Sequence, residues 1–202
     1  MIIKSTRVPA GQTRQVARYL SKVGDNEEVS WLKGNYADIL TMGEVSKLAG
    51  KVFAVRHFSV SPNERMTMKD LALVVQEICL EFDVPRSSAN RIVIVQHQKR
   101  RTSGENNNIH WHVAIPEIHA ETLRTLSSSY FKIRNEKVSR ICELRLGHPL
   151  FLGPFSQVTV AKLSEERPEL FANRHMPCAE QLSGLKILLP ISDIKAPKVA
   201  FR

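Results

Sequence analysis

Three histidines with strand-like spacing are the residues of this sequence best suited to chemistry. His110 and His112 stand on either side of Trp111, and His97 precedes His110 by thirteen positions. Side chains at positions i and i+2 of a β-strand point to the same face. We therefore expect His110 and His112 to present their imidazoles together, while Trp111 turns to the opposite, buried face.

The segments that carry these histidines must lie side by side if the three imidazoles are to act together. Residues 91–97 and 110–116 both have strand-like sequences, and a polar stretch joins them. Antiparallel pairing of the two segments would place His97 beside the pair. Three neutral imidazole nitrogens suit a divalent transition ion such as Mn²⁺ or Zn²⁺ and leave coordination positions for a phosphate oxygen. The alternative is that all three are ordinary solvent-facing histidines at strand ends.

Composition and charge restrict the class of protein. The chain has 202 residues, of which 43% are hydrophobic, enough for one domain with a sizeable core. A formal net charge of +9 and a sequence pI of about 9.7 favour an acidic polymer or surface as partner. This charge is compatible with nucleic-acid binding but does not require it.

The cysteines and the hydropathy pattern indicate a cytoplasmic protein. Cys79, Cys142 and Cys178 are odd in number and lack the spacing of metal ligands, so we interpret them as small buried residues in a reducing compartment. The sequence shows no run of about 20 apolar residues and no signal peptide at its start. We expect no membrane partner.

The order of predicted elements favours an α+β fold with a central antiparallel sheet and helices packed on one face. The stretch 24–51 is punctuated by glycines and is interpreted as loops with short helices. Thr67 with Asp70 resembles a capping box, and Gly147 ends a helix in the left-handed conformation. The predicted strands are 1–6, 52–60, 91–97 and 110–116, and the predicted helices are 12–23, 68–82, 119–128 and 135–146.

The sequence is divided into two parts by its proline distribution. We expect residues 1–150 to form the catalytic domain. Residues 151–202 carry five prolines and are predicted to be a C-terminal appendage, which either wraps the domain or leads to further domains.

Three segments, in this order, resemble motifs of the conjugative relaxases, the mobilisation nucleases that include the T-DNA border endonucleases. The histidine pair with the upstream His97 resembles their histidine-hydrophobe-histidine motif. Residues 19–22, Tyr-Leu-Ser-Lys, resemble the N-terminal tyrosine motif, and residues 57–62, His-Phe-Ser-Val-Ser-Pro, resemble the middle strand with its serine motif. The resemblance covers about residues 10–150.

This resemblance implies a relaxase-like fold and a specific reaction. Tyr19 would be the nucleophile that cuts one DNA strand and forms a 5′-phosphotyrosine. His97, His110 and His112 would hold a divalent ion, Mn²⁺ or Mg²⁺, with Zn²⁺ as the alternative. The substrate would be single-stranded DNA at a transfer origin. Accessory relaxosome proteins and a type IV secretion coupling protein would be partners in conjugation and mobilisation.

Other roles remain open for the individual residues of this site. Tyr19 lies on the apolar spacing of its own helix and could be a core residue, in which case Tyr36 or Tyr130 would compete as nucleophile. His57 could be a fourth polar group near the ion or a partly exposed strand residue.

Basic and hydroxyl-bearing residues near the three motifs are candidate DNA contacts. Each basic residue that neutralises a phosphate would release counterions and make binding salt-dependent, although solvated surface charge would explain the same residues. The two serines could instead form the turn before Pro62. The candidates are Arg14, Arg18, Lys22, Ser59, Ser61, Lys99, Arg100 and Arg101.

The sequence also departs from the family pattern. In the family the first histidine stands closer to the pair, an aspartate follows it by two positions, and an asparagine follows the pair. Here those positions hold Lys99 and Pro116. Glu105 could replace the missing acid, or it could be a solvated loop carboxylate.

Three other functions remain open. A rolling-circle replication initiator or transposase shares the histidine pair, but its tyrosine commonly follows the histidines. A DNA-binding module without catalysis is compatible with the missing acid. A metal-dependent phosphohydrolase would use water as nucleophile.

Overall fold

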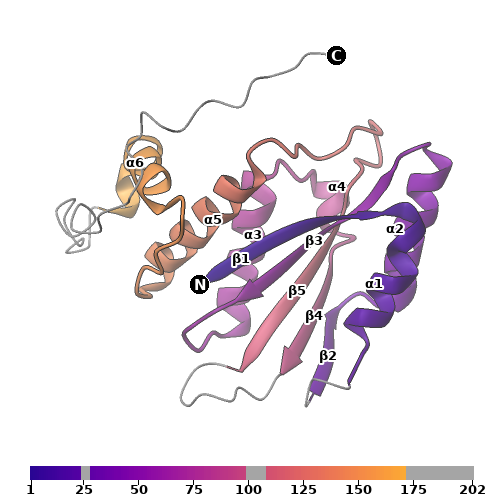
Figure 1. Ribbon diagram of the computed structural model, residues 1–202, viewed down its shortest axis with the longest axis horizontal. Coiled ribbons are helices and arrows are strands. Elements are labelled where there is room, and N and C mark those ends of the chain that lie inside the picture. Colours follow the sequence, from indigo (N-terminus) through magenta and orange to yellow (C-terminus); the bar gives the residue numbers. More distant parts are fainter. Residues whose placement is uncertain (24–27, 99–107, 172–202) are drawn as a thin grey trace.

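The computed structural model describes residues 1–23, 28–98 and 108–171. Within this part of the chain, five antiparallel strands form one sheet in the order β1-β3-β5-β4-β2 (Figure 1). The central strand, β5, therefore lies between β3 and β4. The strands are β1 (Ile2–Pro9), β2 (Glu28–Lys33), β3 (Phe53–Ser61), β4 (Val93–Gln98) and β5 (Ile109–Pro116).

Helices cover both faces of this sheet. The α+β prediction with a central antiparallel sheet is confirmed, but the expectation that only one face is covered is wrong. The α-helices are α1 (Thr13–Leu20), α2 (Tyr36–Leu48), α3 (Met68–Glu81), α4 (Arg86–Ala89), α5 (Phe131–Leu146) and α6 (Ser156–Glu166). Two short 3-10 helices, η1 (Ala10–Gln12) and η2 (Pro168–Leu170), follow β1 and α6.

The alternation of side chains along the strands creates two hydrophobic cores. On one face, α3 and α5 pack against a core that includes Phe58 and Trp111. On the other face, α1 and α2 pack against a core that includes Val95 and Ala114. Because successive residues of a strand point to opposite faces, His112 shares its face with Ala114 and lies on the α1–α2 side.

The predicted pairing of the two histidine-bearing strands is present. His97 of β4 stands directly opposite His110 of β5, and Val95 stands opposite His112. Trp111 is buried on the other face, as expected, and its indole N–H donates to the side-chain oxygen of Gln96 at 3.0 Å. The ladder between β4 and β5 thus fixes where the three imidazoles lie.

The prediction of loops with short helices for residues 24–51 is wrong, because this stretch holds β2 and the long helix α2. The strand β2 lies at the sheet edge, where most of its residues are partly or fully exposed, so its hydrophobic pattern is weak. Helix α2 begins with a capping box in which Asn35 and Asp38 exchange hydrogen bonds. Gly43 does not break the helix. A Cβ atom there would lie 2.4 Å from Oγ1 of Thr13, so glycine allows η1 and α1 to approach α2 closely.

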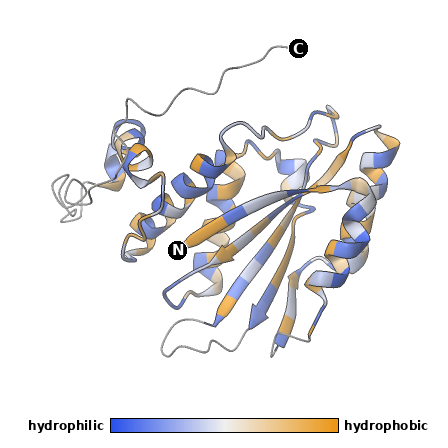
Figure 2. Cartoon of the chain, in the orientation of Figure 1, coloured by the Kyte–Doolittle hydropathy of each residue, from blue (hydrophilic) through white to orange (hydrophobic). Residues whose placement is uncertain are grey.

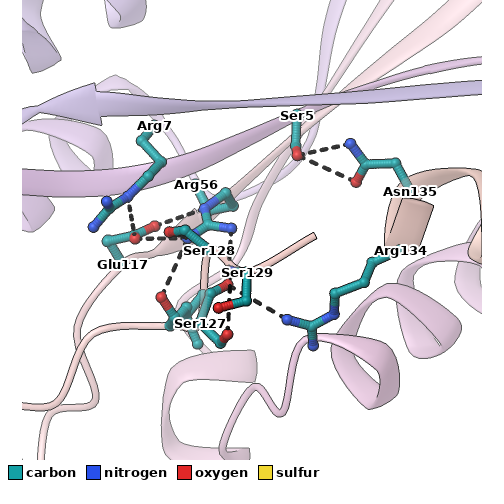
Figure 3. Close-up of polar contacts among 10 residues, drawn as sticks. Ser5, Arg7, Arg56, Glu117, Ser127, Ser128, Ser129, Arg134 and Asn135 are labelled. Atoms are coloured by element: carbon teal, nitrogen blue, oxygen red, sulfur yellow. Dashed lines mark hydrogen bonds and ion pairs between the residues drawn. The ribbon is translucent and has the colours of Figure 1, made fainter. Parts of the chain in front are cut away.

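The predicted helix at 119–128 is absent from the described chain, where these residues form turns and a single bridge between Ile118 and Thr125. Leu123 has a φ angle of 53°, which an α-helix does not allow. The carbonyl oxygen of Ser127 accepts a hydrogen bond from Arg56 (Figure 3). The carbonyl oxygen of Leu126 accepts another from the same guanidinium, and both bonds compete with helix formation.

Arg56 belongs to a buried ion-pair network beneath this segment. Its guanidinium contacts both carboxylate oxygens of Glu117, at 2.9 and 2.7 Å, and the Nε atom of Arg7 lies 2.7 Å from the same carboxylate (Figure 3). Arg56 and Glu117 are both almost fully buried. The network joins β1 and β3 to the chain that leaves β5.

The remaining sequence predictions concern helix ends. Thr67 and Asp70 form the predicted capping box of α3, and Gly147, with a φ angle of 75°, ends α5 in the predicted left-handed conformation. The helices that pack on the sheet carry both hydrophobic and hydrophilic residues (Figure 2). Within the described ranges, none of the helices has the length and apolar character needed to cross a membrane.

Candidate metal and nuclease site

Three imidazoles converge at one end of the β4–β5 ladder. One nitrogen atom from each of His97, His110 and His112 lies within 4.8 Å of the other two. The ring centroids are 4.5 Å apart for His97 and His112, 4.9 Å for His110 and His112, and 5.3 Å for His97 and His110. Nitrogen ligands bound to one ion lie about 3 to 3.5 Å from one another, so small ring rotations would close this cluster around an ion.

Burial favours the neutral form of the central histidine. His97 and His112 are almost fully buried, whereas His110 is partly exposed. Burial, and then the nearby His57, His97 and His110, lower the pKa of His112 to about 2. An unprotonated imidazole keeps the lone pair that a metal ion requires.

For His97 and His112, a hydrogen bond to one ring nitrogen indicates which other nitrogen is left for the cluster. Nε2 of His97 lies 2.9 Å from the carbonyl oxygen of Leu20, so it donates its hydrogen there and leaves the lone pair on Nδ1. Nδ1 of His112 lies 2.9 Å from Nε2 of His57. Nε2 of His112 is buried and has no hydrogen-bond partner within the described residues. A buried nitrogen of this kind is costly unless it binds something, and it fits a metal ligand.

Tyr19 lies at the edge of the histidine cluster. Its side chain is 52% exposed, so the alternative that Tyr19 is a core residue is wrong. The buried face of α1 is formed instead by Thr13, Ala17 and Leu20. The Tyr19 ring meets His112 edge-on at a centroid distance of 5.5 Å and His97 at 6.1 Å. The structure thus places one solvent-accessible phenol beside two of the three clustered imidazoles.

The competing tyrosines have other surroundings. Tyr36 is the first residue of α2 and packs, partly buried, against the core beneath that helix. Tyr130 is exposed and precedes α5, which covers the opposite face of the sheet.

The middle strand contributes more to the site than the sequence indicated. Ser59 stands opposite His112, and the alternation along β3 puts His57, Ser59 and Ser61 on the histidine face. The rings of His57 and His112 are inclined by 22° with their centroids 5.0 Å apart, and they meet at the nitrogen edges that share the hydrogen bond. Burial, and then the nearby His97, lower the pKa of His57 to about 4. The sequence does show that His57 and Ser59 are two positions apart and so share a strand face. It does not show the register of β3 against β5, which brings His57 to His112.

The basic residues among the candidate DNA contacts fall into two groups. Arg14 and Arg18 lie on the exposed side of α1, and Lys22 is exposed just after that helix. The remaining basic candidates, Lys99, Arg100 and Arg101, and the candidate acid Glu105 lie outside the described residues.

A comparison with protein families decides the assignment. The family model described as "Relaxase: MobA/VirD2-like, nuclease domain" matches residues 26–148. The chain belongs to this family. As a relaxase nuclease domain it is a DNA-nicking enzyme of a metal-dependent family, which agrees with a histidine cluster able to hold an ion.

The matched range includes most of the candidate site. It runs from just before β2 to just after α5 and includes His57 and all three clustered histidines. Tyr19 precedes the matched range, and the structure shows only that its ring lies beside His97 and His112. No curated protein and no solved structure shows significant similarity to the chain.

Proposed function

We propose that this relaxase domain is a metal-dependent single-strand DNA endonuclease and strand transferase that acts through a tyrosine. The observation that carries the proposal is the half-exposed phenol of Tyr19 beside the imidazoles of His97 and His112. The three histidine nitrogens would hold a divalent ion, Mn²⁺ or Mg²⁺, with Zn²⁺ as the alternative. Such an ion would polarise a non-bridging phosphate oxygen and would neutralise part of the negative charge on the phosphoryl oxygens.

The proposed reaction is a transesterification. The hydroxyl oxygen of Tyr19 forms a bond to the phosphorus of the scissile phosphodiester, and the bond from phosphorus to the 3′ oxygen breaks. The phenol loses its proton to solvent, and the departing oxygen takes up a proton as a free 3′-OH. The product is a 5′-phosphotyrosine. Because one phosphoester bond replaces another, the phosphotyrosine retains the bond energy, and a 3′-OH can reverse the reaction without ATP and rejoin the strand.

The surroundings of Tyr19 suit a polyanionic strand. Arg14 and Arg18 project from the exposed side of α1, and Lys22 follows that helix, so three cations flank the proposed nucleophile. We assign these residues to phosphate contacts, and Ser59 and Ser61 to contacts with the DNA backbone near the ion. Lys99, Arg100 and Arg101 would extend the basic surface. Glu105 would replace the acid that is missing from the family pattern.

The cellular role that follows is strand processing at a transfer origin, for conjugation or mobilisation. We propose accessory relaxosome proteins and a type IV secretion coupling protein as partners. We also propose that residues 1–150 carry catalysis and that residues 151–202 are an appendage. The first helix of this appendage, α6, packs against α5, where the Ser156 hydroxyl donates to Glu136 at 2.6 Å.

The test is a search for the covalent intermediate. The full chain is incubated with Mn²⁺ and a mixture of single-stranded oligonucleotides, separated on a denaturing gel and mapped by peptide mass spectrometry. The proposal expects a nucleotide adduct on the peptide that contains Tyr19. Cleavage products without any adduct would indicate hydrolysis by water. An adduct on Tyr36 or Tyr130 would show that the assignment of the nucleophile to Tyr19 is wrong.

A further inference from the structure

We propose that His57 is a positioning residue, which holds the imidazole of His112 in the tautomer that directs Nε2 toward the bound ion. The proposal deepens the proposed function, because it concerns the same ion site. It assigns to the middle strand β3 a direct part in building that site, although β3 supplies none of the three clustered ligands.

The first support is the placement of His57 across the β3–β5 ladder. His57 stands opposite Ala114, and Ser59 stands opposite His112, so His57 is the diagonal neighbour of His112 on the same face. Nε2 of His57 lies 2.9 Å from Nδ1 of His112, and the two rings are inclined by only 22°. The position of His57 is thus fixed by β3, a strand that is paired on both sides.

The second support is the balance of hydrogens on His112. A neutral imidazole carries one N–H and one lone pair. If Nδ1 holds the hydrogen, it donates to Nε2 of His57 and the lone pair on Nε2 points to the ion. If Nε2 held the hydrogen, an N–H group would be buried without a partner among the described residues, which is costly. Acceptance by His57 therefore favours the tautomer that can bind metal.

The third support is the charge that this arrangement leaves at the site. The partner of Nδ1 of His112 is a second imidazole rather than a carboxylate. A neutral acceptor orients the ligand without adding negative charge beside the ion. The ion consequently keeps more of its positive charge for an anionic phosphate.

The experiment compares three single variants of the full chain. His57→Phe keeps a ring of similar size but removes the acceptor. His57→Gln supplies an amide oxygen near the position of Nε2 and can accept the same hydrogen bond. His119→Phe, in the turn segment after β5, is the matched control. Mn²⁺ affinity is measured by calorimetry, and the tautomer of His112 is measured in ion-free protein by ¹⁵N NMR of the imidazoles.

We expect His112 of the unmodified protein to carry its hydrogen on Nδ1. His57→Phe should shift that hydrogen toward Nε2 and weaken Mn²⁺ binding by roughly 10- to 100-fold, the usual effect of losing a partner of a metal ligand. His57→Gln should restore both the tautomer and most of the affinity, and His119→Phe should change neither.

Two results would overturn the proposal: a His112 that carries its hydrogen on Nε2 in the unmodified protein, or a Phe variant with unchanged tautomer and affinity. If the unmodified protein bound no ion, the ion-dependent part of the proposed function would fail. The tautomer measurement in ion-free protein would still decide the role of His57.

Discussion

The Nε2 atom of His97 lies 2.9 Å from the carbonyl oxygen of Leu20, the residue that directly follows Tyr19. This hydrogen bond connects a proposed ion ligand on β4 to the last turn of α1. It fixes the orientation of the His97 ring, and it holds the end of the helix that carries the proposed nucleophile. The positions of the phenol and of the imidazoles are therefore coupled through one contact.

Loss of one imidazole is expected to abolish ion binding. His110→Ala is the cleanest variant because His110 is partly exposed, so truncation should disturb the fold little. With two protein ligands left, calorimetry should detect no Mn²⁺ binding, whereas His119→Ala should bind as the unmodified chain does. Unchanged affinity in His110→Ala and in His112→Ala would show that the cluster is not the ion site.

Removal of the Tyr19 hydroxyl should separate binding from cleavage. Because the ring of Tyr19 is half exposed, Tyr19→Phe should change the free energy of unfolding by less than about 0.5 kcal/mol and leave DNA binding intact. Oligonucleotide cleavage and the covalent adduct should both disappear. Tyr130→Phe is the matched control on the other side of the sheet, and it should cut normally. Undiminished nicking by Tyr19→Phe would remove Tyr19 from the mechanism.

The basic surface of α1 should determine part of the salt dependence of DNA binding. Replacing Arg14, Arg18 and Lys22 with Gln removes three cations, and each lost phosphate contact should reduce the slope of log affinity against log salt by about 0.7. Fluorescence anisotropy with a single-stranded oligonucleotide measures this slope. Lys162→Gln on α6 is the control, and neutralising residues 99–101 tests those three cations in the same way. An unchanged slope would mean that these cations are only solvated surface.

Acid should destabilise the ion-free protein. The pKa values of His57 and His112 lie below the ordinary value of 6.5, so the unfolded chain binds more protons than the folded chain in mildly acidic solution. Stability is complete above pH 6.5 and falls as the pH drops toward 4, with up to roughly 2 kcal/mol lost for each histidine by pH 5. Urea unfolding with a chelator at pH 7 and pH 5 measures the loss. His57→Gln should show a weaker dependence, and an equal one would contradict the assignment.

Breaking the buried ion pair of β3 should be the costliest change among those considered. Arg56→Met leaves the carboxylate of Glu117 buried with only Arg7 beside it, and we expect a loss of about 3 kcal/mol in unfolding free energy. Adding Glu117→Gln should recover part of the loss because the buried charge is removed. Arg124→Met, at an exposed position, should be nearly neutral. Urea denaturation measures all three, and a small effect of Arg56→Met would show that water reaches this network.

The parts of the fold that the sequence could predict are those with a strong local signal. The strands at His97 and at His110 follow from β-rich composition, and the α3 capping box follows from Thr67 and Asp70. Helix α2 was missed because glycine usually disfavours a helix. Gly43 is tolerated there because it lets Thr13 pack closely against α2, and this tertiary contact is not visible in the sequence. The turn segment after β5 was mistaken for a helix because the hydrogen bonds that hold it come from Arg56, a residue far away in the sequence.

The candidate site also combines features that a local sequence pattern predicts with features that depend on tertiary contacts. The two-residue spacing of His110 and His112 was sufficient to predict a shared face. The pairing of His57 with His112 was not predictable, since it depends on the register between β3 and β5, which no local pattern specifies. Tyr19 was ambiguous in the sequence because its helix spacing is apolar, and only its exposure distinguishes a site residue from a core residue.

The direct pairing of His97 with His110 has a consequence for the evolution of such sites. Once two strands are in register, the distance between opposed side chains depends on the ladder and not on how many residues connect the strands. Insertions or deletions between residues 98 and 109 can therefore accumulate while the ligand geometry is preserved. Related nucleases should vary widely in this interval, and a motif search that fixes its length would overlook some of them.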